Sequence, residues 1–390
     1  MNTYRLGIFV SHPIQYQVPL YRCLEKSNEL EVSVIFLTDH GVKKTYDPEF
    51  GISIQYDIPL LEGYNYKLLR NISPVPSPSS PFGAINPNLI TNISSSSFDV
   101  VLFHGWSNVS LMAGISIATS KRIPFMIRGD TRPDNAGMSH RKRRLKHLIL
   151  EPIIGRASAC LAIGRLNQQF YLDYGAKPSQ IFSAPYSVET DRFEEFGAMG
   201  RESKHHFLKS LNLDSETPTV LFAAKLQPWK RPLDLVYAID NMVHKPNLIF
   251  IGNGPLMTQL KSLSSSRPWI RLLGFINQSE IAKWYGVADI LVLPSIHEQW
   301  GLTVNEAMSA GCIPIVSDSV GCKDDLVTEE YGEVFQTGNI NELASAIENA
   351  ISKRMTDEQR KRCVEKSREY GIGATAKGIK TAVNWIMESK

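Results

Sequence analysis

Short apolar runs alternate with amphipathic segments along the whole chain. Strand-like runs lie near 5–10, 31–37, 98–103, 124–127 and 158–163, and then near 219–224, 247–251, 270–273, 289–293 and 313–317. The runs at 220–224 and 290–293 are apolar at every position, which is typical of strands that are buried on both faces of a parallel sheet. Strands that alternate with helices in this way predict doubly wound α/β layers.

The number of strands is too large for one sheet, so we expect two doubly wound, Rossmann-like domains. A turn and a helix cap at 186–191, a polar helix and a new first strand suggest domains at 1–190 and 191–370. Residues 371–390 are expected to form a C-terminal helix that packs back on the N-terminal domain. The Ser/Pro-rich stretch 73–81 is incompatible with a helix or an interior strand, so it predicts a long loop of the first domain, near a cleft.

Composition excludes several classes of protein. Hydrophobic residues make up 43% and charged residues 21% of the 390 residues, as in an ordinary globular chain. No apolar run is long enough to cross a bilayer, and the apolar N-terminal run is too short for a signal peptide. The five cysteines form no CxxC pair, which favours a reduced, cytoplasmic compartment and argues against a structural zinc site. A net charge of +3 is too small to indicate nucleic acid.

One segment, 141–147, concentrates basic residues. At helical spacing, Leu145, Leu148, Ile149 and Ile153 form an apolar stripe with the basic residues on the other side. This pattern fits a solvated helix face, and it also fits a patch for an anionic membrane surface or a phosphate-bearing acceptor. The second interpretation would make the protein peripheral at the inner face of the membrane.

Ligands of open α/β sheets bind beyond the carboxyl ends of the strands, so the residues after each strand are candidates for chemistry. Lys225 and Lys230 follow the strand at 219–224 and could clamp a diphosphate, although two surface lysines would look the same. Gly252 and Gly254 follow the strand at 247–251. They allow a tight turn and a close approach of the backbone.

The segment after the strand at 289–293 is the most informative. A helix should begin near Gly301–Thr303 and end at Gly311, with Glu298 on the loop before it and Glu306 about one turn inside. The N–H groups of its first turn would form an anion site. Thr303 and Glu306 also match a capping box, in which the Glu side chain has only a structural role.

The order and spacing of these pieces over about 218–330 resemble the retaining family 4 glycosyltransferases, and the glycine-free loop at 11–19 resembles a subset of them from bacterial polysaccharide clusters. The match includes Glu298 and Glu306 at E-x7-E spacing, the two lysines, the 252–256 turn, and Gly274–Phe275. The resemblance implies the GT-B fold, in which two Rossmann-like domains face across a cleft. It also implies a nucleotide-diphosphate sugar held mainly by the second domain.

The resemblance carries roles onto matching residues. Lys225 and Lys230 would neutralise the diphosphate, Glu298 would hold hydroxyls of the donor sugar, and Glu306 would hold the ribose. The diphosphate would meet the amides near Gly301 and Leu302, and the base would meet Gly274–Phe275. Gly252 and Gly254 would complete the donor side.

The first domain matches less closely, because the loop after its first strand, 11–19, contains no glycine. His104 ends a strand where the family places a His near the transferred sugar, and a packed His is the alternative. Arg128 could serve donor phosphate, Asp130 an acceptor hydroxyl, and His12 the acceptor side. A local salt bridge of Arg128 with Asp130 is the alternative for that pair.

These observations predict a retaining glycosyltransferase that transfers a sugar from a nucleotide-diphosphate donor to a glycan or lipid-linked acceptor in bacterial surface polysaccharide assembly. The chain has no D-x-D motif, so neither a metal nor another cofactor is expected. Two alternatives remain, which are a GT-B sugar-phosphate isomerase or phosphorylase and a non-catalytic nucleotide-sugar-binding protein.

Overall fold

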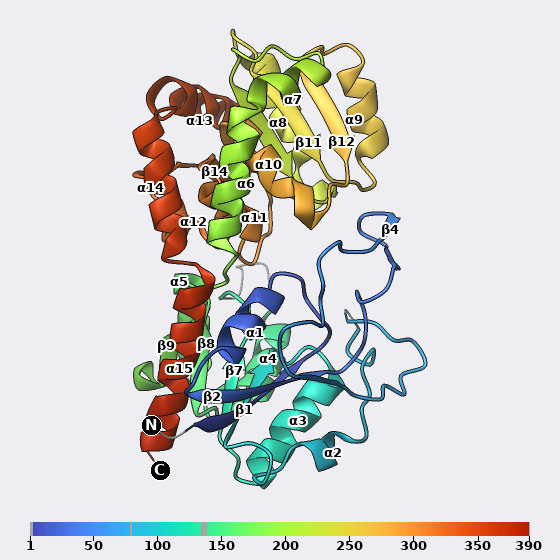
Figure 1. Cartoon of the computed structure of the whole chain (residues 1–390), viewed down its shortest axis with the longest axis vertical. Coiled ribbons are helices and arrows are strands. Elements are labelled where there is room, and N and C mark those ends of the chain that lie inside the picture. The colour runs from blue at the N-terminus through green and yellow to red at the C-terminus, as the bar shows by residue number, and fades with distance from the viewer. Residues whose placement is uncertain (1–2, 79, 134–138, 390) are drawn as a thin grey trace. The chain divides into compact units, whose positions relative to one another are not determined.

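The computed structural model describes residues 3–78, 80–133 and 139–389, and the chain divides into two compact units (Figure 1). Unit 1 comprises Met1–Thr45, Pro59–Tyr186 and Ile372–Lys390, and unit 2 comprises Tyr46–Ile58 and Ser187–Gly371. The assignment of 46–58 to unit 2 differs from the division expected from the sequence, which placed this segment in the first domain.

Unit 1 contains a seven-stranded parallel sheet in the order β5-β2-β1-β6-β7-β8-β9. Its central strands are almost completely buried, as their apolar sequences require. The strands are β1 (Tyr4–Val10), β2 (Leu30–Phe36), β5 (Tyr66–Leu68), β6 (Val100–His104), β7 (Phe125–Arg128), β8 (Ala159–Ala162) and β9 (Ile181–Ser183).

Unit 2 contains a six-stranded parallel sheet in the order β12-β11-β10-β13-β14-β15. The strand order reverses at β10, so the loops after β10 and β13 diverge and leave room for a ligand at the carboxyl edge. The strands are β10 (Thr219–Ala223), β11 (Asn247–Ile251), β12 (Ile270–Gly274), β13 (Ile290–Leu293), β14 (Ile313–Ser317) and β15 (Glu333–Phe335). A separate pair, β3 (Thr45–Asp47) and β4 (Ile52–Ile54), forms a small two-stranded sheet.

Helices connect the strands of both sheets. In unit 1 they are α1 (Val18–Glu25), α2 (Leu89–Asn92), α3 (Val109–Ser120), α4 (His140–Ile154), α5 (Arg165–Asp173), the 3-10 turn η1 (Pro178–Gln180) and α15 (Ile372–Glu388). In unit 2 they are α6 (Thr190–Glu202), α7 (Lys204–Ser210), η2 (Pro228–Lys230), α8 (Pro232–Asn241), α9 (Met257–Ser264), α10 (Gln278–Val287), α11 (Leu302–Ser309), α12 (Lys323–Leu326), α13 (Ile340–Lys353) and α14 (Asp357–Arg368).

The C-terminal helix α15 returns to unit 1, where it lies along β8 and β9 (Figure 1). The hydroxyl of Thr375 donates to the carbonyl of Pro185 at 2.6 Å, and Lys380 pairs with Glu29 at 2.7 Å. At Gly378 a Cβ atom would stand 1.8 Å from the carbonyl oxygen of Ser183, so only glycine permits this contact.

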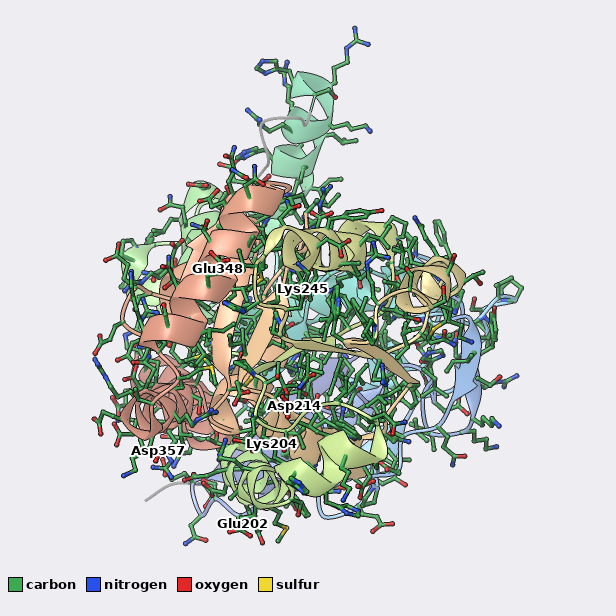
Figure 2. All side chains as sticks on the ribbon, turned by 90° about the horizontal axis from the view of Figure 1, so that it is seen from above. Glu202, Lys204, Asp214, Lys245, Glu348 and Asp357 are labelled. Carbon is green, nitrogen blue, oxygen red and sulfur yellow. The ribbon has the colours of Figure 1, made fainter. Side chains whose placement is uncertain are left out.

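The amino ends of the central strands in unit 2 are held by a buried carboxylate. Asp289 accepts from the amide of Thr219 at 2.8 Å and pairs with Lys204 at 2.6 Å and Arg360 at 2.7 Å (Lys204 is labelled in Figure 2). Burial alone would raise the pKa of Asp289, but the charge of Lys204 and these hydrogen bonds hold it below its ordinary value. This cluster joins α7, β10 and α14 at the end of the sheet opposite the loops that follow the strands.

Helix α4 contains the basic segment, and only Ile153 of its predicted apolar stripe packs against the core. Leu145 is 59% exposed and Leu148 is 68% exposed. The side chains of Lys146 and His147 instead face the rest of unit 1. There the His147 ring stacks on the Tyr174 ring, with centroids 4.2 Å apart. The exposed residues Arg141, Lys142 and Arg144 therefore share the solvent-facing side with three large apolar residues, Leu145, Leu148 and Ile149. Within the described parts of the chain, none of the helices combines the length and the apolar character needed to span a bilayer.

Candidate active site

The loops that follow β10, β11 and β12 are joined by backbone hydrogen bonds. The amide of Leu226 donates to the carbonyl of Asn253 at 2.9 Å, and the amide of Gly252 donates to the carbonyl of Gly274 at 2.8 Å. Gly252 has φ of +134°, and a Cβ atom there would lie 2.0 Å from the carbonyl oxygen of Ala224. The glycines of this turn are thus required by direct contact between neighbouring backbones.

Lys230 and Glu298 meet at the carboxyl edge of unit 2. Lys230 closes the 3-10 turn after β10, Glu298 stands on the loop after β13, and their side chains form an ion pair. The two side chains are 16% and 19% exposed, so the pair is partly shielded from water. The carbonyl of Glu298 accepts from the amide of Gly321 at 3.0 Å, which fixes the loop that carries it.

Helix α11 begins at Leu302, and Gly301 is its N-cap, with φ of +98°. The helix start lies where the sequence predicts it, but Thr303 is inside the first turn and not at the cap. The alternative of a Thr303–Glu306 capping box is therefore wrong. The first turn of α11 follows the Glu298 loop directly, so its N–H dipoles lie at the same edge as Lys230.

Glu306 is half-buried and accepts a hydrogen bond from the hydroxyl of Tyr285 at 2.6 Å. Burial raises the pKa of Glu306 to about 7, against the opposing effects of the Tyr285 hydrogen bond and the charge of Arg192. Groups that donate hydrogen bonds to the charged carboxylate would stabilise that form, and the two hydroxyls of a ribose are such groups.

Lys225 contacts residues that the sequence did not associate with it. Its ammonium group lies 3.2 Å from a carboxylate oxygen of Asp47 and 2.5 Å from one of Glu49. Phe275, expected near the base, packs edge-on against Phe50 with ring centroids 5.4 Å apart. The sequence also did not single out Tyr285, which donates a hydrogen bond to Glu306. These partners come from distant parts of the chain, so no local motif signals them.

In unit 1, two histidines stand at strand ends as expected. His104 ends β6, and its Nε2 atom is buried with no hydrogen-bond partner among the described residues. Burial, together with the nearby charge of Arg128, lowers the pKa of His104 to about 3. His12 follows β1 and contacts the hydroxyl of Ser11 at 2.8 Å, and burial lowers its pKa to about 4. Both rings are therefore neutral near pH 7 and can exchange hydrogen bonds with hydroxyls.

Arg128 is only 2% exposed. Its guanidinium donates to the carbonyls of Ala184 and Pro185 at 3.1 and 2.7 Å and to the side chain of Gln17 at 3.0 Å. These contacts support a local structural role, although the partners are not the Asp130 carboxylate that the sequence suggested. Contact of Arg128 with donor phosphate stays a prediction, as does the acceptor-side role of Asp130.

No group of three or more His, Cys, Asp or Glu side chains that could ligate a metal ion occurs within residues 3–78, 80–133 and 139–389.

Part of unit 2 is similar to known proteins. Residues 203–370 match the family described as "Glycosyl transferases group 1". An uncharacterized glycosyltransferase of Methanocaldococcus jannaschii, MJ1607, is 28% identical over 157 residues, which is 39% of this chain and 40% of that protein. The putative teichuronic acid biosynthesis glycosyltransferase TuaC of Bacillus subtilis is 23% identical over 60% of this chain and 57% of its own. Matches to the first curated relatives span between 29% and 41% of their lengths.

Solved structures match over nearly the whole chain. A glycosyltransferase from Rickettsia africae superposes with a TM-score of 0.75 at 15% identity and covers 100% of both chains. Anabaena Alr3699/HepE, crystallised with UDP-glucose, superposes with a TM-score of 0.71 at 14% identity and covers 98% of this chain and 99% of its own. These likenesses show the fold, and they confirm the expectation of two doubly wound domains of the GT-B class.

Proposed function

We propose that this protein is a retaining glycosyltransferase that transfers a sugar from a nucleotide-diphosphate donor to a glycan or lipid-linked acceptor in bacterial surface polysaccharide assembly. The observation that carries the proposal is the meeting of Lys230 and Glu298 beside the start of α11, with Glu306 one turn further on. One cation, one helix N-terminus and two carboxyl groups at the switch point of a parallel sheet form a site suited to a nucleotide sugar.

The chemistry follows from where charge develops. When the bond between the sugar and the diphosphate breaks, negative charge grows on the leaving phosphate, and fixed cations and N–H dipoles stabilise it most effectively. Lys230 and Lys225 supply the cations, and the first turn of α11 at Gly301 and Leu302 supplies the dipoles. No metal ion is needed for this role.

The carboxyl groups recognise hydroxyls. Glu298 accepts from hydroxyls of the donor sugar, and release of its ion pair with Lys230 frees both groups for the donor. Glu306 accepts from the ribose, while the turn at Gly274 and Phe275 meets the base. In unit 1 the neutral ring of His104 is suited to a hydroxyl of the transferred sugar, and His12 and Asp130 are suited to the acceptor.

The relatives guide the choice of substrates for a first test. A structural neighbour was crystallised with UDP-glucose, which supports a UDP-sugar as donor. The names of TuaC and of the lipopolysaccharide outer core galactosyltransferase WaaB support a surface polysaccharide as the product. The solvent-facing basic and apolar residues of α4 support attachment to an anionic membrane surface.

The test is a screen of the protein against nucleotide sugars by thermal shift, followed by a turnover assay with the best donor. Replacing Lys230 with alanine should reduce turnover by about 100-fold or more, the cost of losing one preorganised group that stabilises the leaving group. Lys261→Ala, an exposed lysine of α9, is the matched control and should leave turnover unchanged. Normal turnover of Lys230→Ala, or activity that a chelator abolishes and magnesium restores, would contradict the mechanism.

A further inference from the structure

Residues 46–58, here named the strap, leave the sequence of unit 1 after Thr45 and return to it at Pro59, but they pack on unit 2. The strap contains part of β3 and all of β4. Its first half approaches the loop after β10, where Asp47 and Glu49 both pair with Lys225. The side chain of Gln227 also donates to the carbonyl of Glu49, so this end of the strap has three polar attachments.

The middle of the strap provides an aromatic ring. Phe50 lies edge-on against Phe275 with centroids 5.4 Å apart, and the ammonium group of Lys225 lies 4.9 Å from the centre of the Phe50 ring. Phe275 follows β12 and is the residue proposed to meet the base. Phe50 therefore occupies one face of the base side of the site.

The far end of the strap is tied to the start of α10. The amide group of Asn277 donates to the carbonyl of Gln55 at 2.7 Å, and the backbone N–H of Ser279 donates to Asp57 at 3.2 Å. The strap thus runs from the Lys225 loop, past Phe275, to the cap of α10. This path crosses the positions proposed for the diphosphate and the base.

The charges around Lys225 determine whether the strap and a nucleotide can bind to it at the same time. Lys225 carries one positive charge, and the two strap carboxylates that contact it carry two negative charges. A nucleoside diphosphate adds two to three further negative charges, and it cannot share the ammonium group with both carboxylates without strong like-charge repulsion. The carboxylates and the diphosphate must therefore compete for Lys225.

We propose that the strap is an internal competitor of the donor nucleotide, whose Asp47 and Glu49 carboxylates exchange with the diphosphate on Lys225 and whose Phe50 gives up its contact with Phe275 to the base. This inference rests on the proposed function and deepens it. Binding of the nucleotide then breaks the contacts between the strap and unit 2. When these contacts form again after the reaction, they help to displace the nucleotide product.

The first test is calorimetry with UDP, and with ADP and GDP in parallel, on the full chain. The Asp47→Asn/Glu49→Gln variant keeps the side-chain size and removes both charges, so it should bind the nucleotide several-fold to about tenfold more tightly, as expected for two partly exposed ion pairs. Its affinity for uridine, which lacks the diphosphate, should change much less. The control Glu202→Gln/Glu348→Gln removes two exposed charges of unit 2, both labelled in Figure 2, and should bind like the wild type.

The outcomes separate the two proposals. Unchanged or weaker UDP binding by the Asp47→Asn/Glu49→Gln variant would overturn the competition while leaving the donor site in place, and weaker binding would mean that the carboxylates position Lys225. If none of the three nucleotides binds either the wild type or the variant, the proposed function fails.

A second measurement follows the strap itself. Addition of UDP should raise amide hydrogen exchange of peptides covering 46–58, because displacement breaks their contacts with unit 2. Lys225→Met removes the group on which the carboxylates exchange. Exchange of 46–58 should therefore be high in this variant without nucleotide and should rise no further with it. Slower exchange of 46–58 on UDP addition to the wild type would show a strap that closes over the nucleotide, and would overturn the proposal.

Discussion

Glu306 makes the stability of this protein depend on pH, because burial raises the pKa of its carboxyl group. Burial raises its pKa from 4.5 to about 7, so between these values the folded state holds a proton that the unfolded chain releases. Stability from this group is therefore fully present below pH 4.5 and is lost as pH rises through 7. A shift of this size corresponds to at most about 3 kcal/mol.

Replacement of Glu306 by glutamine removes the ionisable carboxyl group and keeps the size of the side chain. The melting temperature of Glu306→Gln relative to the wild type should increase steadily from pH 5 to pH 8, as measured by calorimetry at each pH. Donor binding has the opposite dependence, because ribose hydroxyls favour the charged carboxylate. The affinity of the wild type for UDP should rise with pH through 7, and that of the variant should stay flat. Parallel curves for the two proteins would contradict the pKa assignment.

The positions of single residues could be predicted where a strand end and a short spacing define them. Lys230 and Glu298 come from loops that directly follow apolar strands, so their meeting is a consequence of the parallel sheet. The capping box failed for a local reason, since Gly301, with its positive φ, takes the N-cap position two residues before Thr303. The partners of Lys225 could not be predicted, because Asp47 and Glu49 are 178 and 176 residues away in sequence.

At the level of elements, the longer apolar strands were predictable and the three-residue strands were not. All ten predicted strands occur within two residues of their expected ends, since an unbroken apolar run has few other places in a globular fold. The edge strands β5, β9 and β15 are three residues each, and of their residues only Phe335 is buried, so their sequences carry little hydrophobic pattern. The exposed apolar residues of α4 show a further limit. The stripe was correctly located on the helix, but periodicity alone does not reveal which face meets the core.

Helix α4 makes a prediction about membranes. The variant Arg141→Ala/Lys142→Ala/Arg144→Ala removes three exposed charges, each worth about 1 kcal/mol near an anionic surface. It should bind vesicles containing phosphatidylglycerol at least tenfold more weakly than the wild type in co-sedimentation, and neither protein should bind neutral vesicles. The matched variant Lys209→Ala/Lys261→Ala/Lys361→Ala loses the same charge from unit 2 and should bind like the wild type. Equal, negligible binding by all three proteins would remove the membrane from the proposal.

At the level of the whole molecule, each unit has its own sheet and core, and the chain passes between the units four times. Unit 1 is assembled from three segments of sequence and unit 2 from two. The strap and α15 each belong to a different unit from the sequence that adjoins them, and different kinds of contact hold them there. Helix α15 buries an apolar face on unit 1, with Ile379 and Val383 fully buried, whereas the strap is held largely by polar and charged contacts. A contact of the second kind is easier to exchange for a ligand.

Asp289 provides the test that the two units are separate cooperative bodies. Its pKa is held below the ordinary value, so its contribution is present above about pH 4 and is lost as pH falls through the folded pKa. Asp289→Asn leaves Lys204 and Arg360 without their partner and should destabilise unit 2 by about 3 kcal/mol at pH 7. The difference from the wild type should shrink as pH falls below about 4, because the unfolded chain then binds a proton that the folded carboxylate takes up only at lower pH.

Hydrogen exchange at pH 7 locates the effect. In Asp289→Asn, the amides of β10, β13 and β14 should exchange faster, while those of β1 and β6 in unit 1 keep their wild-type rates. Asp240→Asn is the matched control, since its pair with Arg267 is partly exposed and is worth less than about 1 kcal/mol. An equal loss of protection in both units would mean that the chain unfolds as a single body.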